Sequence, residues 1–190
     1  MTSPTSLDLT RDGQQWRSAP MPGASAPLDV VRLDSAPGTF VILGRFPAGF
    51  ERTTVGGYDA AEEFVVLTGE LVLDGRTLVR GDLTHVPAGV VRSGMHTEIG
   101  CTVLAWFSGR ADFRASDELA LAPVAATRTV SVLDVPAGDV LLTDQVRWRL
   151  ESGVGRFGPH DDVIDLALTG WRRGGAPAGT AAPYLVRIGG

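Results

Sequence analysis

The chain has no lysine, no asparagine and only one cysteine among its 190 residues. All 17 basic residues are arginines, which is typical of a GC-rich genome. Without a lysine side chain, Schiff-base chemistry is excluded except at the terminal amine. A single cysteine excludes an intramolecular disulfide and a cysteine-rich metal site. Cys101 stands in the apolar run CTVLAWF, so we expect a buried small hydrophobic residue there.

Long apolar runs are absent as well. The chain contains no run of about 18 apolar residues, the length needed to cross a bilayer. Its N-terminal residues also lack the apolar core of a secretory signal. A net charge of -5 and a pI near 5.1 argue against a nucleic-acid partner, because phosphate binding needs clustered cations. We therefore expect a cytoplasmic protein with no nucleic-acid or membrane partner.

What the chain does contain is typical of one globular domain. Hydrophobic residues make up 44% and charged residues 21%, and 190 residues are too few for two ordinary domains. From Leu28 onward, short runs of Val, Ile, Leu and Phe alternate with Gly, Pro and Asp, which predicts an all-β sandwich or barrel. Asp74-Gly75 between two such runs predicts a tight hairpin. The only short helical candidate starts near Ser116, and Pro123 would end it.

Residues 47–107 contain two spaced motifs of turn residues. Glu62 is followed after six residues by Gly69, and Gly81 precedes the pair Pro87 and Gly89. This pattern resembles the cupin superfamily, in which one motif reads G-x5-H-x-H-x3-4-E-x6-G and the other G-x5-P-x-G-x2-H-x3-N. The resemblance implies a cupin-type jelly-roll β-barrel, and within the superfamily it is closest to ChrR-type cupins and acetylacetone-dioxygenase-like cupins. Further shared residues are Trp16, Pro22-Gly23, Pro47-Ala48-Gly49, Glu62-Glu63, Gly69-Glu70, Gly81-Asp82, Pro87-Ala88-Gly89 and Gly100-Cys101.

Composition and the spacing of the apolar runs suggest how the chain is divided. Residues 1–27 would be an N-terminal arm anchored by Trp16, residues 28–114 the barrel, and residues 115–127 a connector. Residues 128–190 would form either additional strands or a reduced second cupin-like lobe. The second reading is suggested by EEFVVLTGE and DDVIDLALTGW, which both place acids before an apolar run ending in Leu-Thr-Gly. Because edge strands need covering, we expect a homodimer.

Metal-binding cupins hold their ion with two histidines and a glutamate of the first motif and one histidine of the second. Here those positions hold Gly56, Tyr58, Glu62 and Arg92, so only the glutamate remains. The Arg92 guanidinium keeps its charge and would repel a divalent cation. The resemblance therefore predicts a cupin without the family metal site and without a cofactor.

The family geometry would bring Glu62 and Arg92 together as an ion pair, with Tyr58 at the rim of the pocket. We predict Tyr58, Glu62, Arg92 and His85 as catalytic residues, His85 serving as a pocket base. Alternation along the strands suggests an apolar substrate-binding wall, for which the candidates are Phe64, Val66 and Trp106. An ion pair that is satisfied and inert is the alternative interpretation of Glu62 and Arg92.

Three functions are compatible with this pattern. The first is a metal-independent enzyme, an isomerase, cyclase or lyase, acting by acid–base chemistry on a carbonyl-rich small molecule, as in natural-product biosynthesis. The second is a non-catalytic ligand-binding or regulatory cupin. The third is a metallo-dioxygenase with relocated ligands, for which His85, His96 and Glu98 are the candidates. His160 is a further isolated histidine, in the second half of the chain.

Overall fold

The computed structural model describes residues 5–11, 13–119, 126–143, 146–152, 157–174 and 183–189. These residues form β-strands, turns and loops, which confirms the all-β prediction. Within this part of the chain, no helix has the length and apolar character needed to cross a membrane. The chain splits into two compact units, a barrel unit of residues 15–33 and 37–129 and a C-terminal unit of residues 1–14, 34–36 and 130–190.

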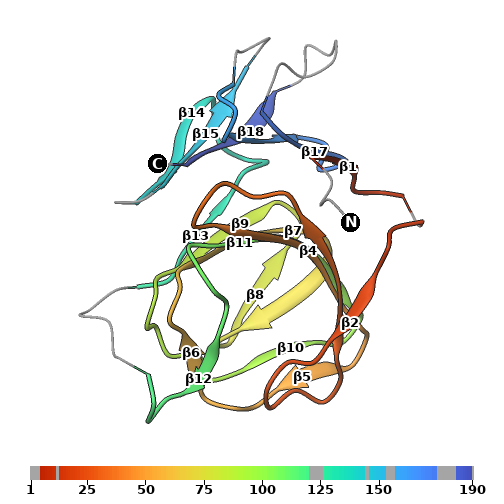
Figure 1. Cartoon of the computed structure of the whole chain (residues 1–190), viewed down its shortest axis with the longest axis vertical. Helices are drawn as coiled ribbons and strands as arrows, with labels where there is room; N and C mark the ends of the chain where they lie inside the picture. Colours follow the sequence, from red (N-terminus) through yellow and green to blue (C-terminus); the bar gives the residue numbers. More distant parts are fainter. Residues whose placement is uncertain are drawn as a thin grey trace. The chain divides into compact units, whose positions relative to one another are not determined.

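The barrel unit is built on a large sheet with the strand order β13-β9-β7-β11-β4-β3-β2. These strands are β2 (Arg17–Ala19), β3 (Leu28–Leu33), β4 (Phe40–Phe46), β7 (Glu62–Leu73), β9 (Asp82–Val86), β11 (Cys101–Phe107) and β13 (Arg128–Ser131). The shorter strands are β5 (Phe50–Arg52), β6 (Gly56–Tyr58), β8 (Arg76–Val79), β10 (Met95–Thr97) and β12 (Phe113–Ala115). Figure 1 shows β4, β7, β9 and β11 on one side of this unit and β5, β6, β10 and β12 on the other. The sheets do not close into a continuous ring.

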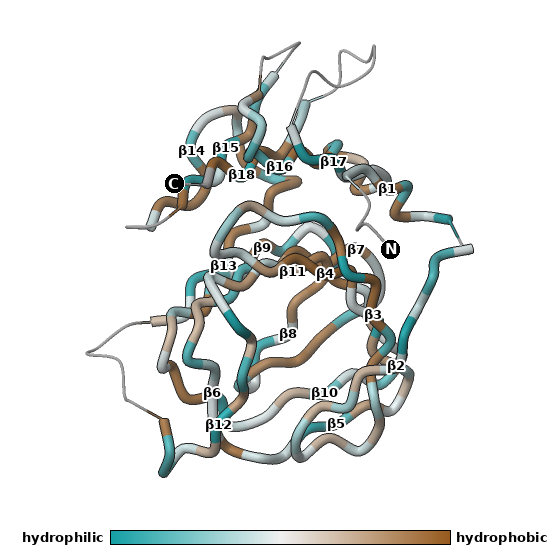
Figure 2. The backbone as a smooth tube through the Cα atoms, in the orientation of Figure 1, coloured by the Kyte–Doolittle hydropathy of each residue, from teal (hydrophilic) through white to brown (hydrophobic). Residues whose placement is uncertain are grey.

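The most hydrophobic segments of the barrel unit include its central strands. β4 and β11 are largely brown in Figure 2, whereas the β5 segment is mostly teal. Phe64, Val103, Ala105 and Phe107 belong to one buried cluster. Cys101 packs there too and is 3% exposed, which confirms that it is a small buried hydrophobic residue. Burial raises the pKa of its thiol to about 12.

A tight turn joins β7 to β8, as the Asp74-Gly75 pattern predicts. Both residues adopt positive φ angles, 51° and 78°, and Leu73 pairs with Arg76 across the turn. Such angles suit a two-residue hairpin between twisted strands. The predicted hairpin is confirmed.

A bulge in β7 changes which of its side chains face inward. Val103 of β11 pairs with Val66 and the preceding Thr102 pairs with Thr68, so Leu67 has no opposite residue. One extra residue reverses the alternation along a strand. The bulge thus allows both ends of this 12-residue strand to contribute to the same interior.

The C-terminal unit contains a six-stranded sheet with the order β1-β17-β16-β18-β15-β14. Its strands are β1 (Ser6–Asp8), β14 (Gly138–Leu142), β15 (Val146–Glu151), β16 (Asp162–Asp165), β17 (Gly170–Arg173) and β18 (Tyr184–Gly189). The segment that is similar in sequence to the start of β7 turns sharply here, with Leu168 at a φ of 55° between β16 and β17. Of the expected connector, residues 116–119 form turns and bends, and residues 120–125 lie outside the described residues.

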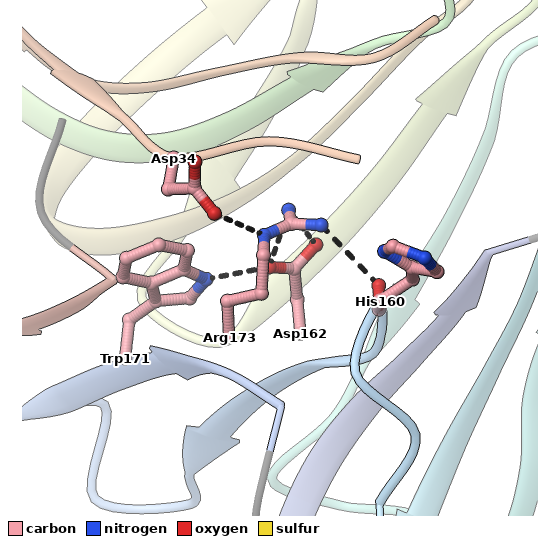
Figure 3. Close-up of polar contacts among 5 residues, drawn as sticks. All are labelled: Asp34, His160, Asp162, Trp171 and Arg173. Carbon is pink, nitrogen blue, oxygen red and sulfur yellow. Dashed lines mark hydrogen bonds and ion pairs between the residues drawn. The ribbon is translucent and has the colours of Figure 1, made fainter. Parts of the chain in front are cut away.

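A buried ion-pair network ties β16 to β17 (Figure 3). Asp162 is fully buried and accepts hydrogen bonds from Trp171 Nε1 at 3.1 Å and from Arg173 Nη2 at 2.9 Å. The Nε of Arg173 lies 3.6 Å from Asp34, and its Nη1 donates to the His160 carbonyl oxygen at 3.4 Å. The buried charge of Asp162 is thus paired with the Arg173 guanidinium and does not stand alone.

Candidate functional site

A cavity of about 530 Å³ lies within the barrel unit. Its walls come from β3, β4, β7 and β11, and most of the lining side chains are apolar. Residues 19–22 and 110–118 also border it, and exposed side chains among them, such as Pro22, Arg110 and Arg114, mark its opening. A concave, largely apolar site with a few polar groups is the usual form of a small-molecule site.

The main polar feature of this wall is an ion pair between Arg92 and Glu62. Nη1 of Arg92 binds Oε2 of Glu62, and the two side chains are only 3% and 12% exposed. Glu62 begins β7, and Arg92 lies beyond β9, where its backbone forms two hydrogen bonds with Gly56 at 2.7 and 3.1 Å. The ion pair that the sequence led us to expect is therefore present.

Tyr58 completes a polar corner with this pair. The guanidinium carbon of Arg92 lies 4.9 Å from the centre of the Tyr58 ring. Phe107 and Phe113 pack edge-on against the same ring, at 5.4 and 5.5 Å between centroids. Burial, and then the negative charge of Glu62, raise the pKa of the Tyr58 phenol above its ordinary value. Tyr58 therefore keeps its proton at neutral pH.

A second buried arginine, Arg52, lies next to this corner and was not among the residues predicted from the sequence. Arg52 is 1% exposed, its guanidinium carbon lies 4.4 Å from the centre of the Phe113 ring, and its Nη1 contacts the Met21 sulfur at 3.5 Å. A hydrogen bond also links Arg52 to Tyr58, and burial lowers the pKa of Arg52. The signal was the alternation in β5, where Arg52 shares the buried side of the strand with Phe50.

The remaining predicted site residues divide between the two faces of the sheet. Phe64 lines the cavity. Val66 packs in the same buried cluster but is not among the lining residues. Trp106 lies between Ala105 and Phe107, which both line the cavity, so its side chain points to the opposite face.

His85 also differs from its expected place in the pocket. It pairs with Glu63, the neighbour of Glu62, and therefore lies on the face away from the cavity. Burial, and then the positive charge of Arg128, lower the pKa of His85. Tyr58, Glu62, Arg92 and Phe64 are thus brought together, whereas His85, Val66 and Trp106 are outside the lining.

The donor set at this corner does not fit the metal that cupins usually hold. Glu62 is the only carboxylate among the four family positions, and Arg92 already binds it. At Gly56, a Cβ atom would lie 2.1 Å from the backbone oxygen of Arg114, so a histidine has no room. Among the described residues, no three His, Cys, Asp or Glu side chains are grouped to hold a metal ion. The alternative ligand set His85, His96 and Glu98 is therefore not grouped either.

Comparisons with known proteins agree on the fold. No family model matches the chain, and no curated protein matches it in sequence. A candidate dioxygenase of Nostoc punctiforme is similar in structure, with a TM-score of 0.67 and 16% identity over 96% of this chain and 81% of that one. Ylba of Escherichia coli gives a TM-score of 0.56 and 12% identity over 96% of this chain and 88% of its own.

A candidate glyoxylate-induced protein of Pseudomonas aeruginosa is also similar, with a TM-score of 0.56 and 13% identity over 91% of this chain and 84% of that one. The structural neighbours are cupin-fold proteins, and the chain has a cupin-type β fold. At these identities the likeness extends to the fold alone.

Proposed function

We propose that this protein is an enzyme that performs acid–base chemistry, without a metal, on a carbonyl-bearing small molecule held in the barrel cavity. The observation that carries the proposal is the buried Glu62–Arg92 ion pair beside Tyr58, in the wall of a largely apolar cavity of about 530 Å³. A carboxylate, a guanidinium and a phenol at one place offer one proton acceptor and two hydrogen-bond donors. Isomerisation, cyclisation and dehydration are reactions of this type.

Each of the three side chains has a defined part. Glu62 takes a proton from the carbon next to the carbonyl group. The C–H electron pair forms a new carbon–carbon double bond, and the carbonyl π pair moves onto the oxygen. Arg92 and Tyr58 donate hydrogen bonds to that oxyanion, and donors held in a water-poor site stabilise such charge strongly. In a substrate with a double bond between the β and γ carbons, Glu62 returns the proton to the γ carbon of the dienolate, the carbonyl re-forms and an isomer results. Where the β carbon bears a hydroxyl group, Glu62 gives the proton to that oxygen, the C–O bond breaks with loss of water, and the oxyanion pair re-forms the carbonyl.

The protonation of Tyr58 supports its part as a donor. Burial, and then the charge of Glu62, raise its pKa, so the phenol has a hydrogen to give at neutral pH. His85 has no part in this scheme, because it lies on the other face of the sheet. The apolar walls favour substrate carbon and exclude water, which strengthens each polar contact.

A ligand-binding or regulatory protein without catalysis is the second candidate. The observation that favours it is the direct contact between Arg92 and Glu62, since each neutralises the charge of the other. A dioxygenase, as the name of the Nostoc punctiforme structure suggests, would need a donor set that these four positions do not supply.

Proton exchange in heavy water distinguishes these candidates. The protein is mixed in D₂O with a panel of ketones and keto acids, and the loss of the α-proton signal is followed by ¹H NMR. An enzyme of the proposed kind exchanges that proton faster than the buffer does for at least one compound. Glu62→Gln should slow the catalysed exchange roughly 10²–10⁴-fold, the usual contribution of a general base.

The matched control is Glu98→Gln, because Glu98 is an exposed carboxylate that does not line the cavity. It should leave the exchange rate unchanged. Equal rates in Glu62→Gln and the unaltered protein would refute the role of Glu62. Binding across the panel without any exchange would favour the non-catalytic candidate.

A further inference from the structure

The charges at one corner of the cavity do not balance. Arg52 and Arg92 are 1% and 3% exposed. Of the three described carboxylate side chains that line the cavity, Glu62 is the one that pairs with Arg92, whereas Asp112 and Glu118 belong to the segment at the opening. Among the described residues, Arg52 forms no ion pair, and its side chain contacts a sulfur atom, an aromatic ring and a phenol. Two buried cations therefore share one buried anion. A buried charge without a counter-charge is costly, so this corner lacks one negative charge.

We infer that the cavity takes an organic acid with a single carboxylate and an apolar body, the carboxylate lying beside Arg92 in the field of Arg52. The inference deepens the proposed function and rests on it for placing the substrate in this cavity. The acid would supply the charge that the protein does not.

An unused donor gives the carboxylate a definite place. Among the described residues, Nε of Arg92 is buried and has no hydrogen-bond partner, while Nη1 of the same guanidinium forms an ion pair with Glu62. Guanidinium groups bind carboxylates through pairs of parallel N–H donors. A ligand carboxylate at Nε would satisfy a polar atom that is otherwise left without a partner.

The surroundings of Arg52 do not remove its charge. The ring of Phe113 attracts the cation through its π face, and the Met21 sulfur is a weak acceptor, but neither has a net charge. Met21, Tyr58 and Phe113 all line the cavity, so Arg52 stands one side-chain layer behind the wall. At that depth little water screens it, and its field extends into the cavity.

In the part of the chain that the structure describes, the opening of the cavity has no excess of positive charge, because the exposed Glu118 borders it together with two ion pairs. Arg114 pairs with Asp59, and Arg110 pairs with Asp112 at 3.0 Å. The excess of positive charge is thus confined to the inner corner, where Tyr58, Glu62 and Arg92 meet. The apolar walls that surround this corner would hold the body of the acid.

Paired probes of equal shape test this inference. Hexanoate is compared with hexanamide, and benzoate with benzamide, by isothermal titration calorimetry at pH 7. Each acid should bind at least about 10-fold more tightly than its amide, because charge-assisted hydrogen bonds to guanidinium are much stronger than neutral ones. Equal affinity of acid and amide would overturn the inference, as would the absence of acid binding at millimolar concentration.

Variants of Arg52 locate the effect. Arg52→Met should weaken the binding of the acid about 10-fold or more and leave the amide unchanged, and Arg52→Lys, which keeps the charge, should fall between. Arg45→Met is the control, because Arg45 pairs with Asp29 at 2.8 Å outside this cavity. A parallel loss of acid and amide affinity in Arg52→Met would refute the role of its charge. If Arg52→Met does not fold, the comparison of acid with amide on the unaltered protein still decides.

This test is independent of turnover. Acid binding without α-proton exchange would leave the inference intact and refute the enzymatic function. Exchange of neutral ketones without any preference for acids would refute the inference and leave the proposed enzymatic function intact.

Discussion

Arg92 and Glu62 contact each other at the positions where metal-binding cupins place two ligands of one ion. The two side chains are 3% and 12% exposed, so their charges meet with little water between them.

The first prediction concerns the coupling of this pair. Glu62→Gln should lower the free energy of unfolding by about 3–5 kcal/mol, because the charges of Arg92 and Arg52 then stay buried without an anion. Arg92→Met should lower it less, because Arg52 still attracts Glu62. The double variant should cost less than the sum of the two, as urea denaturation would measure. The exposed pair of Arg45 and Asp29 serves as the control and should show almost no coupling. Strict additivity at Glu62 and Arg92 would contradict the contact.

The second prediction concerns alkaline pH and Tyr58. Its pKa in the folded protein is raised, chiefly by burial, above a value near 10 in the unfolded chain. Above about pH 10 the unfolded chain therefore releases this proton while the folded protein keeps it, so stability is full below that pH and falls as pH rises. Tyr58→Phe should make this decline shallower in urea denaturation between pH 8 and 11. An unchanged slope would show that Tyr58 ionises alike in both states.

The third prediction compares two glycines of β7 and its turn. Gly69 and Gly75 have φ angles of 73° and 78°, so alanine is strained at both, by about 1–2 kcal/mol. Only at Gly69 would the new Cβ collide, 2.0 Å from the backbone oxygen of Gly100. Thermal or urea unfolding should therefore show a clearly larger loss for Gly69→Ala than for Gly75→Ala. Equal losses would mean that the neighbouring strand gives way at no cost.

The fourth prediction concerns metal content. Because Glu62 is bound by Arg92 and Gly56 leaves no room for a side chain, we expect no stoichiometric transition metal in protein purified without chelators. Inductively coupled plasma mass spectrometry measures this directly. About one iron, manganese, nickel or zinc ion per chain, lost on chelation together with function, would point to ligands outside the described residues.

Much of the barrel unit could be predicted from its sequence, because the decisive signals are local. The Asp74-Gly75 turn follows from backbone preferences, and the positions of Glu62 and Arg92 follow from motif spacing. Whether a side chain faces the cavity depends instead on strand register. A difference of one position puts His85 and Trp106 opposite Glu63 on the outer face rather than beside Glu62.

Arg52 was missed for a related reason. It lies outside both motifs, on the three-residue strand β5, and its neighbours Met21 and Phe113 come from distant parts of the chain. Sequence spacing contains no information about such long-range contacts. Alternation along β5 indicates that Arg52 shares a side with Phe50, but the contacts that bury this side come from other parts of the chain.

The two backbone hydrogen bonds between Gly56 and Arg92, together with the nearby Arg114 carbonyl, have a consequence for protein engineering. Substituting histidine for Arg92 alone would free Glu62, yet it would not rebuild a metal centre, because position 56 cannot accept a side chain until β12 moves away. A designer would have to reposition a strand before changing a ligand. For this barrel, regaining a metal would thus require remodelling the backbone as well as replacing side chains.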